Sequence, residues 1–511
     1  MQPTQLPFIP VIIIGGGFSG LAMGAQLKRK LNFEDYILYD RSPDLGAGRL
    51  HTAVSWYAHE VIQVEPGGRI DVNPGCGVDI PSIYYSLSFA PNPDFTQFFP
   101  EQPEILQYIK STAKKFGVDK HAKFNTSWDG AVWQEATKTW IVRLSDTRTG
   151  EIFSQECRVL ISGTGALVNP NPCEIPGVDS FHGPVVHTAK WPQELNIEGK
   201  EVVVIGNGCS ATQVVPAIAP HVKSVHQFMR SPQFFLPRPN PTIGPVLRWI
   251  FRYVPFVQTF IRWMFFHIFE YTVGQFYLSP RGARHRRRWQ WLSDWYLESC
   301  APKQYWDILK PNYLIGCKRR VFDPGYLTSL RRDNVRLTNE PIVKIDESGV
   351  VTKSGQHYPA DVIVLATGFQ ISSYNVNLVG RDGVTPTQHW AKFGGVEAYK
   401  SIACAPFPNF FFLYGPNSST GVVDLILKVA GPVIKGRVSD VAVKLDYEKE
   451  FSDTQQKALS QRVWVDCKSV SELVQRLEWL ESYTLPVVNV HTLGANCIPY
   501  DEGMGFRQQG A

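Results

Sequence analysis

The sequence predicts an α/β fold in which one parallel-sheet domain is inserted into another, together with an additional helical segment. Three observations support this prediction. A glycine-rich strand–turn–helix unit occupies residues 10–27, and a second one occupies residues 200–219. Two apolar strands end in the same Thr-Gly turn, at residues 158–166 and 361–369. The chain of 511 residues is long enough for two or three domains, each with its own core.

The first unit has the features of a dinucleotide-binding βαβ motif. A short apolar strand leads into Gly15-x-Gly17-x-x-Gly20, and an Ala/Leu-rich helix follows. The glycines permit a tight turn and close approach of a pyrophosphate, while the helix N-terminus offers free N–H groups to the phosphates. The next strand ends in Asp40, whose carboxylate can accept hydrogen bonds from ribose hydroxyls. This unit therefore predicts a nucleotide with a free ribose, such as FAD.

The second unit differs from the first at the end of its second strand. Its motif is Gly206-x-Gly208-x-x-Ala211, and the following strand ends in Arg230 where the first unit has an acid. An acid would repel a 2′-phosphate, whereas an arginine can pair with it. The second site should therefore prefer NADPH to NADH. The alternative is that Arg230 is a solvated residue at a strand end.

The two Thr-Gly turns predict how the domains are joined. A buried strand ending in Thr-Gly is typical of the point where a chain leaves a nucleotide-binding sheet and crosses to the neighbouring domain. The expected fold class is therefore α/β with two Rossmann-like domains, the NADP domain inserted in the FAD domain, plus a helical insertion. The expected order is an FAD domain at 1–168 and 367–511, a linker at 169–195, an NADP domain at 196–239 and 301–366, and the helical insertion at 240–300.

Composition and charge narrow the class of protein. The apolar and charged fractions are those of a soluble globular protein. The nine cysteines are scattered without a CxxC pair, which favours reduced thiols and a cytoplasmic location over a zinc site or a disulfide scaffold. The net charge of +5 is local, because residues 241–292 hold eight arginines and one acid, Glu270. No nucleic-acid-binding motif accompanies these arginines, so we expect no nucleic-acid partner.

The stretch FHGPVVHTAKWP, at 181–192, lies between the two units and is too rich in Pro and Gly for a helix and too irregular for an ordinary strand. We interpret it as a connector. Its FxGxxxHxxxWP pattern resembles the signature of the Baeyer–Villiger branch of the flavin-dependent monooxygenases. Further segments resemble the same branch, in the same order: PGCGVDIPSIYYSLSF (74–89), GCKRRVFDPGYL (316–327), RDGVTPTQHW (381–390), FPNFFFLYGPNSSTG (407–421) and LGAN (493–496). The resemblance covers essentially the whole chain except 240–300.

The resemblance implies a reaction and roles for individual residues. NADPH reduces FAD, O2 adds to the flavin, and the resulting peroxyflavin converts a ketone to an ester or lactone. The anionic species need a fixed positive charge in a water-poor site, which by resemblance Arg319 supplies, with Lys318 toward the cofactor phosphate. Asp79 resembles the acid that holds this arginine beside the flavin, and Tyr85 matches a flavin contact. By resemblance His187 belongs to the connector that couples cofactor binding to domain motion.

The motifs and the resemblance together predict three sets of site residues and no metal. The predicted catalytic residues are Arg319 and Asp79. The predicted FAD contacts are Gly15, Gly17, Phe18, Ser19, Gly20, Asp40, Gly67, Gly68, Asp79 and Tyr85. The predicted NADP contacts are Gly206, Gly208, Cys209, Ser210, Ala211, Gln213, Arg230, Ser231, Lys318 and His187.

Residues 47–73 depart from the family pattern. The family's Asp-x-Gly-Gly-Thr-Trp begins correctly at Asp44, but the Thr-Trp pair is replaced by Arg69-Ile70 after a long insert. One interpretation is a real loop that remakes the flavin contacts around Gly67 and Gly68. The other is translated non-coding sequence, in which case the chain would bind FAD poorly.

Residues 240–300 form the second unusual segment, aromatic-rich and interrupted by arginines and Pro255. The favoured interpretation is a helical insertion that packs over the active-site cleft and shapes the substrate pocket. The second interpretation is a peripheral patch at 241–292 that lies on an intracellular membrane, with aromatics in the bilayer surface and arginines on anionic headgroups.

The biological role rests on resemblance alone. Several features resemble fungal members of the family that tailor polyketides, in particular the group oxidising anthraquinone-type ketones such as averufin in sterigmatocystin and aflatoxin biosynthesis. An aromatic, hydrophobic ketone would then be the substrate, with O2 as co-substrate. Two alternatives stay open: an N- or S-oxygenating flavin monooxygenase, and a catalytically impaired FAD-binding protein.

Overall fold

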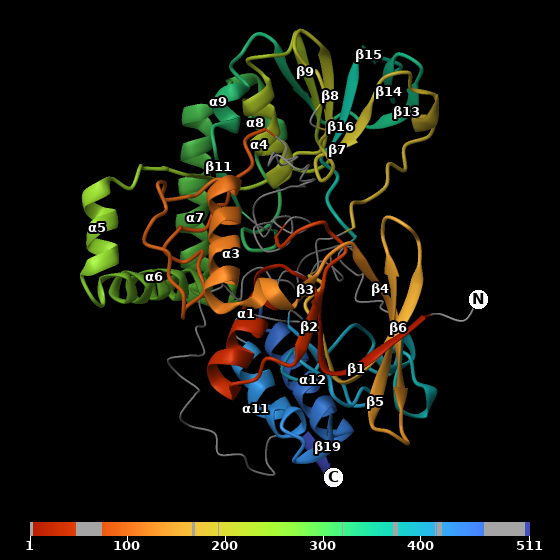
Figure 1. Ribbon diagram of the computed structural model, residues 1–511. Coiled ribbons are helices and arrows are strands. Elements are labelled where there is room, and N and C mark those ends of the chain that lie inside the picture. The colour runs from red at the N-terminus through yellow and green to blue at the C-terminus, as the bar shows by residue number, and fades with distance from the viewer. Residues whose placement is uncertain are drawn as a thin grey trace.

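The computed structural model is shown in Figure 1, coloured from the N-terminus in red to the C-terminus in blue. It describes residues 4–46, 74–165, 169–192, 194–318, 320–370, 377–413, 415 and 422–463, and the backbone of 506–510. The predicted sites Arg319, Gly67 and Gly68 lie outside the described residues, as does the insert at 47–73.

The first sheet has eight strands and is assembled from both ends of the chain. Its order is β17-β4-β5-β6-β1-β2-β3, with β18 pairing with β6. The strands are β1 Thr4–Ile14, β2 Tyr36–Tyr39, β3 Ala122–Lys123, β4 Thr126–Gln134, β5 Thr139–Asp146, β6 Ile152–Ser162, β17 Leu378–Val379 and β18 Phe410–Phe412. Strands β3, β2, β1, β6 and β18 are parallel along this path. Because β17 and β18 follow the second sheet in the chain, the first domain is interrupted as predicted.

The second sheet is entirely parallel, in the order β12-β9-β8-β16-β7. Its strands are β7 Val185–His187, β8 Glu201–Ile205, β9 Ser224–Phe228, β12 Val335–Thr338 and β16 Val362–Leu365. Figure 1 shows it above the first sheet, with α4 (Cys209–Ile218), α8 (Trp306–Leu309) and α9 (Tyr326–Ser329) beside it. Both Thr-Gly strands, β6 and β16, lie in these two sheets, so the predicted fold class is confirmed.

One expectation about local structure is wrong. The sequence at 181–192 predicts a connector too irregular for an ordinary strand, but its centre forms the edge strand β7, paired with β16. A three-residue strand can form because only one of its edges needs a partner. The preceding Gly183 has little space, since a Cβ there would lie 2.3 Å from the Asp361 carbonyl oxygen.

The remaining elements surround the two sheets. The other strands are β10 Phe235–Pro237 with β11 Val321–Asp323, the antiparallel β13 Ile342–Asp346, β14 Gly349–Thr352 and β15 His357–Pro359, and β19 Val438–Val443 with β20 Phe506–Gly510. The helices of the first domain are α1 Phe18–Gln26, continued by the π-helix η1 Leu27–Leu31, α3 Gln102–Phe116, α10 Pro386–Trp390, α11 Val422–Ile434 and α12 Leu445–Leu459. Short 3-10 turns are η2 Val118–His121, η3 Val178–Ser180, η4 Gly274–Phe276, η5 Lys303–Tyr305 and η6 Arg381–Gly383.

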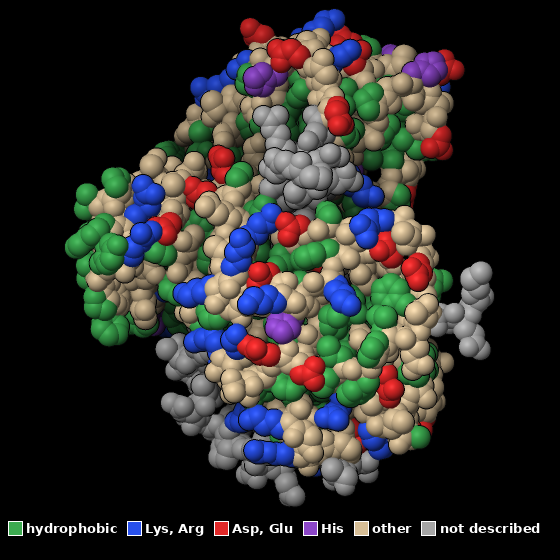
Figure 2. Space-filling model, in the orientation of Figure 1, with side chains coloured by type: hydrophobic (Ala, Val, Ile, Leu, Met, Phe, Trp, Pro, Cys, Tyr) green, Lys and Arg blue, Asp and Glu red, His purple; other side chains and the backbone are tan. Residues whose placement is uncertain are grey.

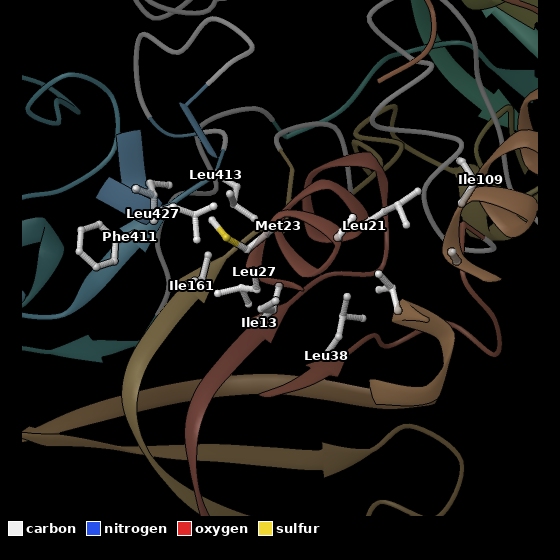
Figure 3. Packing of buried hydrophobic residues seen from close by; sticks show 14 of the residues in the cluster. Ile13, Leu21, Met23, Leu27, Leu38, Ile109, Ile161, Phe411, Leu413 and Leu427 are labelled. Atoms are coloured by element: carbon white, nitrogen blue, oxygen red, sulfur yellow. The ribbon is translucent and has the colours of Figure 1, made fainter. Parts of the chain in front are cut away.

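The core of the first domain joins the N-terminal motif to the C-terminal return of the chain. Residues alternate along β1, so that Ile13 faces one core cluster and Ile12 faces another on the opposite side of the sheet. Figure 3 shows side chains of helix α1 lying among those of the sheet and Leu427 of α11. Its labelled side chains are Ile13, Leu21, Met23, Leu27, Leu38, Ile109, Ile161, Phe411, Leu413 and Leu427. Burying each such side chain stabilises the folded state by about 1.5–3 kcal/mol. This packing holds the glycine loop between β1 and α1 in place.

The segment 240–300 is helical, as predicted. It forms α5 Pro245–Tyr253, α6 Val257–Val273 and α7 Pro280–Cys300. Helices α5 and α6 project from one side of the molecule in Figure 1, while Leu297 at the end of α7 packs into the core of the second domain. Of the described helices, none has the length and apolar character that crossing a membrane requires.

The described cysteines are mostly reduced. Cys76, Cys157, Cys173, Cys209, Cys300 and Cys404 are free thiols. Cys317 is disulfide-bonded, so the expectation of reduced thiols is wrong at that position.

Candidate active site

The first glycine motif forms a tight turn between β1 and α1. Gly15 has φ +112°, a conformation that favours glycine. Gly20 lies so close to this turn that a Cβ would stand 1.9 Å from the Gly15 carbonyl oxygen. Gly17 caps α1 in an extended conformation and Ser19 lies in the helix's first turn, so the free N–H groups of this turn surround the loop.

Asp40 lies beside this loop, where β2 ends. Its side chain is buried and accepts hydrogen bonds from the backbone N–H groups of Gly16, at 2.5 Å, and Ser42, at 2.9 Å. These two bonds fix the carboxylate in one orientation. The structure therefore brings the predicted ribose acid and the predicted phosphate loop together, as the motif requires.

Phe18, from the same loop, forms an aromatic cluster with two tyrosines. Its ring meets Tyr85 edge to face at a centroid distance of 5.3 Å and stacks on Tyr108 at 5.9 Å. The Tyr85 hydroxyl is buried and has no hydrogen-bond partner among the described residues. Burial raises the pKa of Tyr85 well above its usual value, so the hydroxyl is protonated and can donate. A buried hydroxyl without a partner costs about 1–3 kcal/mol, so a ligand with an acceptor would fit here.

Asp79 lies near Tyr85 at the boundary of the two domains. It is buried, and burial raises its pKa well above the usual value, although the positive charge of Arg238 opposes this shift. Arg238 follows β10 in the second domain and donates to the Val78 carbonyl oxygen at 2.5 Å. Its guanidinium also lies over the Phe99 ring, 5.1 Å from the centroid. Arg238 is not predicted from the sequence, where its only signal is a charged residue inside the apolar run FFLPRP.

Gln213 joins the second glycine helix to the segment that carries Asp79. Its side-chain amide nitrogen donates to the Gly77 carbonyl oxygen at 2.9 Å. A Cβ at Gly75 would stand 2.8 Å from the Gln213 carbonyl oxygen, so glycine is needed for this close packing. The predicted NADP contact Gln213 thus lies where the two domains meet.

The second glycine motif repeats the first with one change. Gly206 has φ +123°, and a Cβ there would stand 2.2 Å from the Ala366 carbonyl oxygen. Space in front of α4 is open at Gly208, where a Cβ would have no described atom within 4 Å. Ala211 replaces the third glycine and is fully buried, while Ser210 lies beside it in the first turn. Burial raises the pKa of the neighbouring Cys209, which is therefore a thiol at neutral pH.

Three of the predicted NADP contacts gather at the end of β9. The Lys318 ammonium lies 3.2 Å from the Ser231 hydroxyl and 4.9 Å from the centroid of the Tyr313 ring. Ser231 also accepts a hydrogen bond at its carbonyl oxygen from the Asn207 side chain, at 2.8 Å, which links this corner to the glycine loop. Arg230 is exposed and forms no ion pair with another described residue. Two cations and a hydroxyl beside a phosphate-binding loop are suited to a further phosphate. Asn207 and Tyr313 were not predicted.

His187 fastens the edge strand β7 to the Thr-Gly turn after β16. Its Nδ1 accepts the Ala189 backbone N–H at 2.9 Å, so Nε2 carries the proton and donates to the Gly368 carbonyl oxygen at 3.1 Å. Burial lowers the pKa of His187 to about 4, and the ring is neutral at neutral pH. Through these bonds, His187 holds in place the segment where the chain crosses between the domains.

The two crossings between the domains lie side by side. Asn171 N–H donates to the Gly368 carbonyl oxygen at 3.0 Å, and Gln370 N–H donates to Asn169 at 2.8 Å. The Asn171 side chain adds a bond to the Thr367 carbonyl oxygen at 3.0 Å. The domains are therefore joined by a short hydrogen-bonded pair of segments.

A second cluster of polar side chains lies in the first domain, away from the glycine loops. The ligand-type atoms of His389, Cys404 and Glu448 all lie within 4.8 Å of one another and are buried. His389 Nε2 and Glu448 Oε1 are 2.9 Å apart, and the other Glu448 oxygen accepts the Ala405 N–H at 2.8 Å. Burial raises the pKa of the Cys404 thiol, which lies 3.4 Å from the Glu397 carbonyl oxygen. These hydrogen bonds satisfy the polar atoms of the cluster, which therefore has a structural role.

Comparison with known proteins identifies the family. A family model described as flavin-binding monooxygenase-like matches residues 10–241. A Baeyer–Villiger monooxygenase of Streptomyces coelicolor is 30% identical over 82% of this chain and 76% of its own length. The FAD-binding monooxygenase tazF of Aspergillus terreus is 31% identical over 89% of this chain and 81% of its own. The chain belongs to the flavin-binding monooxygenase family.

Solved structures agree with this assignment at the level of the fold. The closed crystal structure of cyclohexanone monooxygenase covers the whole chain with a TM-score of 0.78 and 22% identity. Oxidized steroid monooxygenase bound to NADP covers 99% of the chain with a TM-score of 0.78 and 24% identity. At the level of the family, the predicted class of enzyme, a flavin-dependent monooxygenase, is confirmed.

The described residues of this monooxygenase fit both cofactors. On the FAD side they offer the constricted loop at Gly15 and Gly20, the fixed carboxylate of Asp40 and the buried hydroxyl of Tyr85. On the NADP side they offer the open space at Gly208 and the Lys318–Ser231 pair. The predicted Arg319, between the described Lys318 and Arg320, lies outside the described residues.

Proposed function

We propose that this monooxygenase converts a ketone to an ester or lactone. The observation that supports the proposal most strongly is the position of Asp79, which lies near the FAD-side Tyr85 and near Arg238 of the NADP domain. A reaction that needs both cofactors must take place where the two domains meet.

When bound, FAD would supply electron transfer from NADPH and the activation of O2. The protein's own residues would bind and orient the two cofactors. Asp40 would hold the ribose and the α1 N-terminus the pyrophosphate, while the protonated Tyr85 hydroxyl would donate a hydrogen bond toward the flavin. Lys318, Ser231 and Arg230 would hold the 2′-phosphate of NADPH.

Asp79 and Arg319 would place a permanent positive charge beside the reacting atoms. An arginine stays protonated even when water is excluded, and it stabilises the negative charge that develops on oxygen during the insertion. The Arg238 guanidinium favours the ionised form of Asp79, which would keep the carboxylate able to hold Arg319.

Replacement of Arg319 by Ala tests this assignment. Reduction of the bound flavin by NADPH should proceed at a near wild-type rate, because Arg319 has no proposed role in it. Ester formation should fall below detection. An Arg319→Ala enzyme that forms ester at a near wild-type rate would show that the role belongs to another residue.

We propose further that the substrate is an aromatic, hydrophobic ketone in fungal polyketide or mycotoxin biosynthesis, with an averufin-type ketone as the specific candidate, in the cytoplasm. The chain is similar to two fungal FAD-binding monooxygenases, tazF of Aspergillus terreus and ktnD of Aspergillus niger, and this similarity supports the fungal part of the proposal. Assaying aromatic polyketide ketones beside steroid and cyclic aliphatic ketones tests it. Turnover confined to the aliphatic set would refute the polyketide role and leave the reaction class standing.

A further inference from the structure

Helices α5 and α6 carry a large apolar surface that no described residue covers. We call it the aromatic face, and its members are exposed by 38–81%: Val246, Leu247, Trp249, Tyr253, Val254, Phe256, Phe260, Trp263, Met264, Ile268 and Tyr271. The most exposed are Phe256, in the turn between the helices, at 81%, and Val246 at 72%. Figure 2 shows hydrophobic side chains gathered on the lobe at the left, which α5 and α6 form.

Helix α6 has two apolar stripes, and only one of them has a partner. The inner stripe contacts the first domain: Phe269 meets Tyr84 edge to face at 5.7 Å, and Phe265 lies 5.7 Å from Phe98. Arg262, on this stripe, donates to the Ile83 carbonyl oxygen at 2.7 Å. The outer stripe recurs at helical spacing along the opposite side of the helix, at positions 260, 263, 264, 268 and 271.

A helix that is apolar on both sides is normally buried on both sides. Soluble monomers rarely expose contiguous apolar patches beyond a few hundred Å², and larger ones mark interaction surfaces. Within α5 no residue is buried, and within α6 only Thr272 is. The inner stripe positions the hairpin, and the outer one is left for a partner.

The charges around the aromatic face indicate the kind of partner. Residues 241–292 contain eight arginines and a single acid, Glu270. Two of these arginines are already engaged with the first domain, because Arg252 pairs with Asp94 and Arg262 donates to the Ile83 carbonyl oxygen. Arg281, Arg284 and Arg287 on α7 are exposed, and Arg288 donates to the hydroxyl of Tyr271, at the edge of the face, at 3.0 Å. An apolar aromatic surface beside arginines complements an anionic lipid surface, where the rings enter the interface and the arginines meet headgroups.

We infer that the α5–α6 hairpin lies on the surface of an anionic lipid bilayer through its aromatic face. A second copy of the chain is a poorer partner, because two-fold pairing of this face would bring the arginines of both copies together. The described helices lack a membrane-spanning segment, so the hairpin lies along the surface. The exposed outer stripe favours a patch on a membrane surface over a helical insertion that only packs over the active-site cleft.

Sedimentation with vesicles of phosphatidylcholine, with and without phosphatidylserine, tests the inference. The full-length protein should bind vesicles that contain phosphatidylserine, and binding should weaken as salt rises. Combined Trp249→Ser, Phe256→Ser and Trp263→Ser should reduce binding at least ten-fold. The control, Phe8→Ser, Ile152→Ser and Leu445→Ser, removes three apolar residues elsewhere that are exposed by 47–57%, and it should bind like wild type.

A second measurement does not depend on whether the triple Ser variant folds. The tryptophan fluorescence of the wild-type protein should be quenched by brominated lipids. The double variant Trp249→Phe with Trp263→Phe, which keeps aromatic side chains at both positions, should lose most of that quenching. The inference would be overturned if the wild-type protein bound vesicles with phosphatidylserine no more strongly than vesicles of phosphatidylcholine alone. It would also be overturned if the Phe variant were quenched as much as wild type. If the wild-type protein were a dimer in solution without vesicles and the triple Ser variant were a monomer, the aromatic face would be assigned to a second copy instead.

Discussion

At the scale of single residues, the glycines of the two motifs differ in a measurable way. Gly20 has no room for a methyl group, whereas Gly208 has open space around its Cβ position. Gly20→Ala should therefore destabilise the first domain by about 1–3 kcal/mol or more and lose bound flavin, seen as reduced visible absorbance after purification.

Gly208→Ala is the matched control for this prediction. It should keep the flavin and the thermal midpoint of wild type, while the KM for NADPH rises because the methyl group occupies the space in front of α4. Equal flavin retention in the two variants would contradict the steric account of the first loop.

The pair Asp79 and Arg238 gives a second prediction. Removing the buried guanidinium in Arg238→Gln leaves Asp79 without the charge that opposes its raised pKa, so that pKa should rise further. The acidic limb of the pH profile of kcat/KM for ester formation should move to higher pH. The thermal midpoint should also fall, since the substitution disturbs the buried hydrogen bond from Arg238 to the Val78 carbonyl oxygen, and an unsatisfied buried group costs about 1–3 kcal/mol.

Arg238→Lys keeps a positive charge and should retain the wild-type position of the acidic limb better than Arg238→Gln. Superimposable pH profiles for wild type and Arg238→Gln would show that Arg238 does not control the ionisation of Asp79.

His187 predicts how stability depends on pH. Its pKa is lowered from 6.5 to about 4, so between these values the unfolded chain binds a proton that the folded chain does not. The stabilisation from neutral His187 is complete above about pH 6.5 and is lost as pH falls toward 4, amounting to on the order of 3 kcal/mol.

His187→Gln cannot titrate, yet its amide can still accept and donate a hydrogen bond. The thermal midpoint of this variant, followed by circular dichroism from pH 7 to pH 4, should fall less steeply than that of wild type. Parallel curves would mean that another group governs the pH dependence.

The residues that the sequence could predict are those with local patterns. Gly15, Gly20 and Asp40 belong to one βαβ unit, and the geometry of that unit alone brings them together. Arg238 lies 160 positions from its partner Val78, and no local pattern signals a contact formed only when two domains pack. The roles of the predicted contacts toward cofactors remain predictions.

At the scale of elements, the end of β9 is the place where we propose that the choice of nicotinamide cofactor is made. Arg230 directly precedes Ser231, whose hydroxyl lies 3.2 Å from the Lys318 ammonium. Arg230 should pair with the 2′-phosphate that NADPH has and NADH lacks. Arg230→Ala should raise the KM for NADPH about ten- to a hundred-fold, as expected for loss of a charged hydrogen bond worth about 1.5–3 kcal/mol. The KM for NADH should change less than about two-fold.

Arg336→Ala is the control, because Arg336 is an exposed arginine on the neighbouring strand β12. It should leave both KM values unchanged. Equal effects of Arg230→Ala on NADPH and NADH would remove Arg230 from the phosphate site.

Strand β7 and helix α6 show where predictions of elements from sequence reach their limit. A three-residue edge strand leaves no period-2 pattern in the sequence. The sequence therefore predicts an irregular segment where the structure has β7. The helices of 240–300 were predicted from composition, but both stripes of α6 are apolar. Sequence periodicity could not show which stripe would face the protein.

At the scale of the whole molecule, the interrupted domain follows from the two Thr-Gly strands. β6 lies in the first sheet and β16 in the second, and the chain then returns to add β17 and β18 to the first. The hydrogen-bonded crossings at Asn171 and Gly368 connect the domains at one place. Two nucleotide sites joined in this way can act on one substrate between them.

The central claim is that both cofactor sites serve the insertion of one oxygen atom into a ketone. Purified enzyme, NADPH and a ketone from the productive set are incubated under isotopically labelled oxygen gas, and the product is analysed by mass spectrometry. The account predicts an ester or lactone that carries one labelled oxygen, with one NADPH consumed per product. Consumption of NADPH with unlabelled product, or labelling only of an added amine or sulfide, would contradict it.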